Sequence, residues 1–182
     1  MATGPKKGLN PARKIGQGPN NGGFTTYTIA SGYATALFTG DVVKMASDGT
    51  IQKASNGDVA VGVLVGVQYV DTNGTPQHKP YFPAAFTSTQ PIYAKVDDDP
   101  NSTYHVTANA SVASVTPNTL WAASLGAGST TFGLSGTLLD VGAGEKTATP
   151  ATAMFKVVKV TDAANNVLEV QLSRSEYRVN DN

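Results

Sequence analysis

The chain has 182 residues, enough for one domain that buries its own core, and it contains no cysteine, which excludes disulfide bonds, zinc sites built on cysteine and thiol nucleophiles. Charged residues make up only 14% of the chain, with 13 lysines and arginines balanced by 13 aspartates and glutamates, so the formal net charge is zero. Valine, threonine, alanine, glycine, serine and asparagine are abundant instead, a composition that favours strands and turns over helices.

The balanced net charge hides an asymmetry along the chain. Residues 1–40 contain no acid and four cations, whereas residues 41–182 hold all 13 acids against nine bases, a net charge of −4. A basic segment on a mildly acidic body can bind an acidic protein surface, but four positive charges are too few to favour nucleic acid as the partner. The four cations are Lys6, Lys7, Arg13 and Lys14.

Residues 1–23 are predicted to form an extended N-terminal arm, and residues 24–182 a β-rich domain. Glycine, proline and asparagine dominate the arm, from Gly4-Pro5 to the run at 18–23. Proline removes backbone donors and glycine raises the entropic cost of ordering, so the arm is expected to order on a partner. Its removal is expected to weaken attachment to that partner and to leave the domain folded.

Short strands separated by turns are predicted from residue 24 to residue 70. The segment 24–29 is rich in strand formers, and residues 41–53 form a predicted hairpin around Asp48-Gly49. Residues 59–70 are the most strand-like stretch of the chain. Gly62 and Gly66 within it predict a bulge or a close approach of another backbone.

The second half continues the pattern less regularly. Residues 91–96 and 103–107 are predicted strands joined by a turn at 97–101, and a final hairpin is predicted at 154–172 around Asn165-Asn166. Residues 108–150 are polar and glycine-rich, with one short helix predicted from Pro117 to a stop at Gly126. The spacing of the strands predicts an all-β fold, either a small β-barrel or a β-sandwich, with at most one short helix.

Catalytic residue patterns are largely missing. The two histidines, His78 and His105, are expected to be structural, and no G-x-S-x-G motif is present. The acidic run at 97–99 lacks the alternate spacing of a Ca²⁺ loop and is predicted to be a hydrated turn. In Gly142-Ala143-Gly144-Glu145-Lys146-Thr147, Glu145 separates glycine from lysine where a phosphate-binding loop requires them adjacent. We therefore expect no catalytic residues, no cofactor and no metal.

A binding module is the alternative that the aromatic residues leave open. The chain contains seven tyrosines, six phenylalanines and one tryptophan, spread along its length. Such side chains serve core packing most often, but they can also form a platform for a sugar. A carbohydrate- or receptor-binding β-module on a virion, or a small tail or fibre-base component, is therefore the alternative function. In a carbohydrate-binding module, Trp121 and Tyr81 would be candidates for the platform.

One extended phrase resembles a known family. Residues Gly40 to Met45, Asp48 to Ala54 and Gly57 to Gly66 follow the form G-D-x-V … D-G-x-[VI]-x-x-A … G-V. In this respect the chain resembles the capsid decoration, or cement, proteins of tailed bacteriophages. The close of the chain, Val167 to Arg178, also resembles the end of small phage virion proteins.

The resemblance implies a non-enzymatic structural protein that binds the outer surface of a phage capsid and stabilises the shell. It implies the major capsid protein as partner, a homo-oligomer with a trimer favoured, and a position on the capsid exterior after assembly in the host cytoplasm. The arm residues Lys6, Lys7, Arg13 and Lys14 would then be the capsid-binding anchors. The chain contains no run of about 18 apolar residues, so no membrane span is predicted. The first residues lack the apolar centre of a secretory signal.

Overall fold

The computed structural model describes residues 8–16, 18–19, 23–142, 146–147 and 151–177. Apart from one 3-10 turn, η1 (Val112–Ser114), the regular elements in these residues are strands. In chain order they are β1 (Asn10–Lys14), β2 (Gly18–Pro19), β3 (Thr25–Ile29), β4 (Leu37–Phe38), β5 (Val42–Met45), β6 (Ile51–Lys53), β7 (Gly62–Val70), β8 (Pro76–Lys79), β9 (Tyr81–Phe82), β10 (Ile92–Asp97), β11 (Ser102–Thr107), β12 (Leu120–Trp121), β13 (Ala123–Ser129), β14 (Leu134–Leu139), β15 (Lys146–Thr147), β16 (Phe155–Asp162) and β17 (Val167–Leu172).

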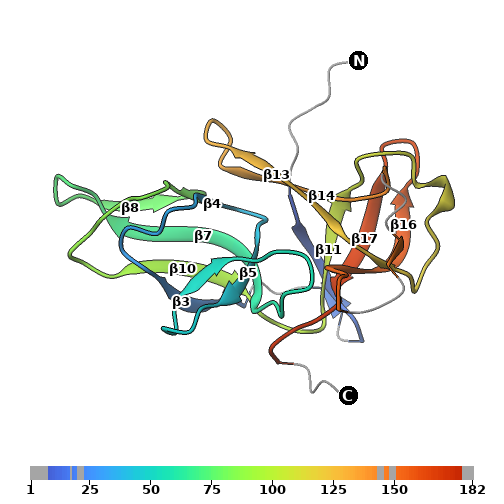
Figure 1. The fold of residues 1–182 in the computed structure, drawn as a ribbon, viewed down its shortest axis with the longest axis horizontal. Helices are drawn as coiled ribbons and strands as arrows, with labels where there is room; N and C mark the ends of the chain where they lie inside the picture. Colours follow the sequence, from blue (N-terminus) through green and yellow to red (C-terminus); the bar gives the residue numbers. More distant parts are fainter. Residues whose placement is uncertain (1–7, 17, 20–22, 143–145, 148–150, 178–182) are drawn as a thin grey trace.

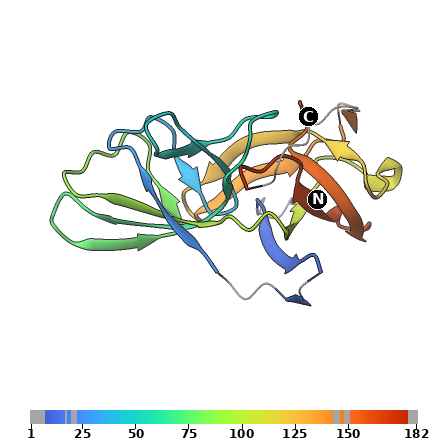
Figure 2. The same cartoon turned by 90° about the horizontal axis from the view of Figure 1, so that it is seen from below.

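The strands form two large antiparallel sheets and two small ones. The first sheet has the order β15-β12-β16-β17-β11-β1-β2, and the second has the order β3-β10-β7-β5-β6 with β8 beside β7. The pairs β13-β14 and β4-β9 form the small sheets. Figure 1 shows the second sheet at one end of the molecule, β11, β16 and β17 at the other, and the β13-β14 ribbon between them. The same division into two lobes is visible after the 90° turn in Figure 2.

The all-β prediction is confirmed. The described strands do not close into a barrel, and several antiparallel sheets packed together are consistent with the sandwich-like alternative. Successive side chains of a strand point to opposite faces of its sheet. In β10, Ile92, Ala94 and Val96 are therefore buried on the core face, while Tyr93 and Lys95 are exposed on the other face. No helix in the described residues is long and apolar enough to cross a membrane.

Two hydrophobic cores lie inside the molecule, and two strands contribute to both. The first core is centred on Tyr104, Trp121 and Phe155, and the second on Leu64, Phe82 and Ile92. In β5, Val42 belongs to the first core and Val43 to the second; in β7, Val63 and Leu64 divide in the same way. Because successive side chains of a strand point to opposite faces, β5 and β7 stand between the two cores.

The predicted hairpins at 41–53 and 154–172 and the predicted special glycines are confirmed. Hairpin β5-β6 turns at Gly49 with φ 80°, and hairpin β16-β17 has Asn166 with φ 54° in its connection. The β7-β10 ladder shifts register near Gly66, which is the expected bulge. At Gly62 a Cβ atom would lie 2.2 Å from the carbonyl oxygen of Asp97, so the close backbone approach is also present.

Two local predictions are wrong. Residues 97–101 do not close a hairpin, because β10 pairs with β3 and β7 whereas β11 pairs with β1 and β17, so the chain crosses here from the second sheet to the first. The helix predicted after Pro117 is absent: β12 and β13 occupy its place. Trp121 pairs with Phe155 in the first sheet. This tertiary pairing overrides a weak local preference for helix, which Gly126 reduces further.

Part of the segment predicted as an arm belongs to the first sheet. Strand β1 pairs with β11, and Leu9 just before it is buried in the first core. Leu9 donates its backbone N–H to the carbonyl oxygen of Gly40, and the N···O distance is 3.1 Å. Gly40 has φ +88°, and a Cβ there would lie within 3 Å of the Leu9 backbone, so this contact requires glycine.

Candidate functional site

The structure places two of the four predicted anchor residues in ion pairs. The Arg13 Nε atom lies 2.8 Å from the Glu169 Oε1 atom, and the Lys14 Nζ atom lies 2.8 Å from the Asp99 Oδ2 atom. The charges of Arg13 and Lys14 are thus offset by carboxylates of the same chain. Lys6 and Lys7 lie outside the described residues, and their role as capsid anchors stays a prediction.

Glu169 is a nearly completely buried carboxylate in β17. It accepts hydrogen bonds from Arg13 and from the Thr103 hydroxyl, both at 2.8 Å, and the Lys159 Nζ atom lies 3.3 Å away. Burial alone would raise the pKa of the Glu169 carboxyl, but the Thr103 hydrogen bond and the charges of Lys159 and Arg13 outweigh it, so its pKa lies below the usual value. The site ties β1, β11, β16 and β17 together.

The Glu169 site predicts a loss of stability in acid. A lowered pKa in the folded state means that the carboxylate stabilises the fold above its unfolded pKa of about 4.3, and that this contribution is lost as the pH falls through the folded value. Because Arg13 and Lys159 are partly exposed, we expect Glu169→Gln to cost only roughly 1–2 kcal/mol at neutral pH. Urea unfolding from pH 7 to pH 3 should show a shallower acid slope for the variant; an unchanged slope would contradict this role.

The acidic run at the crossing between the sheets does not converge on one point. The Ser102 hydroxyl donates to Asp97 at 2.9 Å, the Tyr27 hydroxyl to Asp98 at 2.8 Å, and the Lys14 ammonium to Asp99. The Lys14 hydrogen bond holds the pKa of Asp99 below its usual value. Among the described residues, no group of three or more histidine, aspartate or glutamate side chains is arranged to hold a metal ion.

Tyr27 also joins the end of the chain to the second sheet. Its hydroxyl lies 2.5 Å from that of Tyr177, besides donating to Asp98. Burial, together with these two partners, raises the pKa of Tyr27 far above its usual value, so the phenol stays protonated. The contact orders Tyr177 against β3, although Tyr177 itself remains half exposed.

The two histidines lie on different sheets, His78 in β8 and His105 in β11, so they do not form one site.

The two candidates for a sugar-binding aromatic platform, Trp121 and Tyr81, have other contacts in the structure. Trp121 is 3% exposed and donates its indole N–H to Thr119, so it cannot serve a surface platform, and Tyr81 stacks on Phe38 with ring centroids 5.6 Å apart. The large aromatic side chains that do reach the surface are Phe24, Tyr93, Phe132 and Tyr177.

Asp41 is a buried residue whose role sequence reasoning did not identify. It has no solvent exposure and accepts hydrogen bonds from the Phe38 backbone N–H at 2.8 Å and the Ser135 hydroxyl at 2.6 Å. The Lys53 Nζ atom lies 3.0 Å from it. Gly40-Asp41 begins the sequence phrase that carries the family resemblance. This place in the phrase was the one signal in the sequence that could have drawn attention to Asp41.

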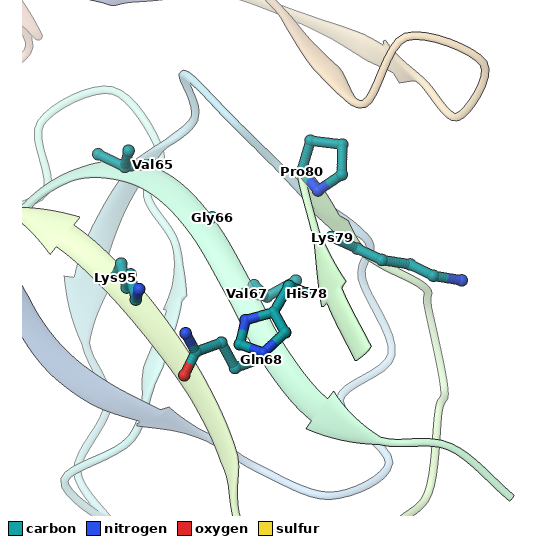
Figure 3. A pocket seen from close by; sticks show the side chains of 8 residues that line it. All are labelled: Val65, Gly66, Val67, Gln68, His78, Lys79, Pro80 and Lys95. Atoms are coloured by element: carbon teal, nitrogen blue, oxygen red, sulfur yellow. The ribbon is translucent and has the colours of Figure 1, made fainter. Parts of the chain in front are cut away.

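A shallow hollow of about 260 Å³ lies on the outer face of the second sheet. Figure 3 shows the side chains of Gln68, His78 and Lys95 around it, with Gly66 between Lys95 and Pro80. The remaining lining residues are Val65, Val67 and Lys79, and the Lys79 side chain points away from the group.

The outer edge of β3 is the other distinctive surface. Its inner edge pairs with β10 through five consecutive residues, Thr25 to Ile29, without a register shift. No strand in the described part of the chain pairs with its outer edge, and Thr25, Thr26 and Thr28 are exposed. Beyond Ile29 the gap to β6 is bridged by the Tyr33 hydroxyl, which accepts a hydrogen bond from the Lys53 backbone N–H. The open part of the edge is therefore its Thr25 end, next to the exposed Phe24.

Comparisons with protein-family models, with curated proteins and with solved structures gave no match to this chain.

Proposed function

We propose that this protein is a non-enzymatic virion structural protein that binds the outer surface of a bacteriophage capsid and stabilises the shell. Its partner would be the major capsid protein, and several copies would act together as a homo-oligomer, with a trimer favoured. It would reach the capsid exterior after assembly in the host cytoplasm. Repetition over a shell lets a modest affinity per copy produce firm attachment.

The observation that supports a binding role most directly is the open edge of β3. Unpaired strand edges present N–H and C=O groups that readily pair with a strand of another chain, and folded proteins usually protect them. The other edges in the described part of the chain are short or protected: β2, β4, β9 and β15 have two residues each, β6 has three with Lys53, and β8 contains Pro76 and Lys79. Strand β13 has a register shift and two glycines, and β14 is bridged at both ends.

Strand β3 lies near β6 across the gap that Tyr33 bridges, but its open Thr25 end has none of these protections. Its five residues, Thr-Thr-Tyr-Thr-Ile, include no proline and no charge, and its ladder has no bulge. An extended segment of a partner would find a regular row of backbone groups there, with Phe24 as an apolar contact at its end. We therefore propose β3 as the main contact with the shell, together with the predicted anchors Lys6 and Lys7.

The resemblance to decoration proteins is compatible with this arrangement. Its central phrase covers β5, β6 and the first part of β7, which form the frame of the second sheet. These strands support β10, and β10 in turn supports β3. The phrase would therefore encode the scaffold that presents the binding strand.

The test is cosedimentation of the purified protein with empty shells of the source virus. Lysines on an edge strand oppose pairing, so Thr26→Lys combined with Thr28→Lys should weaken binding at least about tenfold relative to the wild type. Thr72→Lys combined with Thr131→Lys adds the same charge at exposed positions away from β3 and should bind as the wild type does. Thermal unfolding of all three proteins checks that they are folded.

Saturable binding that only the β3 variant loses supports both the function and the surface. Saturable binding that the β3 variant keeps would support the function and reject β3 as the contact. A wild-type protein that does not bind the shells at any concentration tested would reject the proposed function.

A further inference from the structure

The hollow on the second sheet exists because one position in β7 has no side chain. Gly66 lies opposite Lys95 of β10 in the ladder. A Cβ atom built at Gly66 would meet only the Lys79 carbonyl oxygen, at 3.7 Å, which is an ordinary contact distance. A side chain would therefore fit at this position, unlike at Gly62, and its absence leaves open space beside Lys95.

Three polar side chains surround this space, and each comes from a different strand. They are Gln68 of β7, His78 of β8 and Lys95 of β10, and Figure 3 shows the imidazole of His78 beside the amide of Gln68. Within the described residues, none of the three has a side-chain hydrogen bond or an ion pair. No aspartate or glutamate lines the hollow. The site thus presents the Lys95 ammonium group and several hydrogen-bond donors to solvent, while the Lys79 side chain points away from it.

An aromatic side chain borders the same site. Tyr93 pairs with Gln68 across the β7-β10 ladder and with Thr28 across the β3-β10 ladder. Directly paired residues on one face have Cβ atoms only about 5 Å apart, so the row Thr28, Tyr93, Gln68, His78 is continuous over four strands. Tyr93 is 40% exposed, which leaves part of its ring accessible as an apolar wall.

We infer that this hollow is a binding site for a saccharide that bears a carboxylate, such as a uronic acid. Lys95 supplies the charge for the carboxylate, Gln68 and His78 can bind hydroxyl groups, and the Tyr93 ring can pack against the C–H face of the sugar. A neutral sugar has no negative charge to pair with the Lys95 ammonium group. A nucleic acid strand would require a longer row of cations than the hollow offers. The inference is independent of shell binding, because it uses the outer face of the sheet rather than the edge of β3.

Titration of the isotope-labelled protein with glucuronate, followed by two-dimensional amide NMR spectra, tests the inference. Shifts should concentrate at Gly66, Gln68, His78 and Lys95, with a Kd on the order of 1 mM, as expected for a ligand of this size on an open site. Glucose and acetate are the controls, and each should bind at least about tenfold more weakly. Glucose binding equal to glucuronate would overturn the role of Lys95, and equal binding of acetate would overturn the saccharide. No shifts at these residues would overturn the site altogether.

Two variants separate binding from folding. Gly66→Ala places a methyl group in the hollow without a clash and should keep the thermal unfolding midpoint at or above that of the wild type while glucuronate affinity falls at least about fivefold. Lys95→Ala should reduce affinity about tenfold, whereas Lys156→Ala, which removes the same charge from β16 of the first sheet, should not. A folded Gly66→Ala protein that binds glucuronate as the wild type does would overturn the proposal.

Discussion

Replacing Asp41 by alanine is expected to lower the free energy of unfolding by about 3–5 kcal/mol, one of the two largest effects that we predict for this protein. Asp41 is fully buried, and its carboxylate is shared by the Phe38 backbone, Lys53 and Ser135. Alanine would leave a buried N–H and a buried hydroxyl without this acceptor, and it would leave the mostly buried Lys53 ammonium without its counter-charge.

Equilibrium unfolding in urea, followed by tryptophan fluorescence, measures this loss. Asp48→Ala is the matched control, because Asp48 is an exposed aspartate in the turn of the β5-β6 hairpin. The control should lose much less stability than Asp41→Ala. A similar small loss for both variants would show that the Asp41 contacts contribute little, and the connection from β5 to β6 and β14 would then have to depend on apolar packing.

Deletion of residues 1–14 is expected to destabilise the whole domain by at least about 3 kcal/mol. The deletion removes Leu9 from the first core, which alone is comparable to a large-to-small core substitution. It also removes β1 from the edge of β11 and takes Arg13 away from the buried Glu169. This expected result differs from the expectation drawn from the sequence, that the domain stays folded when the arm, residues 1–23, is removed.

A shorter deletion provides the control. Removing residues 1–7 takes away Lys6 and Lys7 but none of the contacts that Leu9, β1 and Arg13 make. Its urea midpoint should stay close to that of the wild type, and only its attachment to shells should weaken. Equal midpoints for the two deletions would contradict a structural role for β1.

The sequence predicted the fold class and most of the hairpins because those features depend on neighbouring residues. Alternation in Ile92–Asp97 and the turn residues Gly49 and Asn166 act within a few positions. The crossing at 97–101 was missed because a turn and a change of sheet use the same polar residues. The helix after Pro117 was predicted from local preference, whereas pairing of Trp121 with Phe155, more than thirty residues away, decides the structure.

The candidate sites depend on still longer separations. Asp41 meets Ser135 across 94 positions, and no local pattern links an aspartate after a glycine to a serine in a later ribbon. The hollow requires the register of three strands, which brings Gly66 opposite Lys95 and Gln68 opposite His78. The sequence did mark Gly66 as unusual. The sequence could not show which residues of the neighbouring strands lie opposite Gly66 and Gln68.

The two strands that stand between the cores have a mechanical consequence. At Val42-Val43 and at Val63-Leu64, neighbouring residues of one backbone are held by different cores, so a displacement of either core pulls directly on the other. We therefore expect a load applied to one lobe to be passed through β5 and β7 to the other lobe.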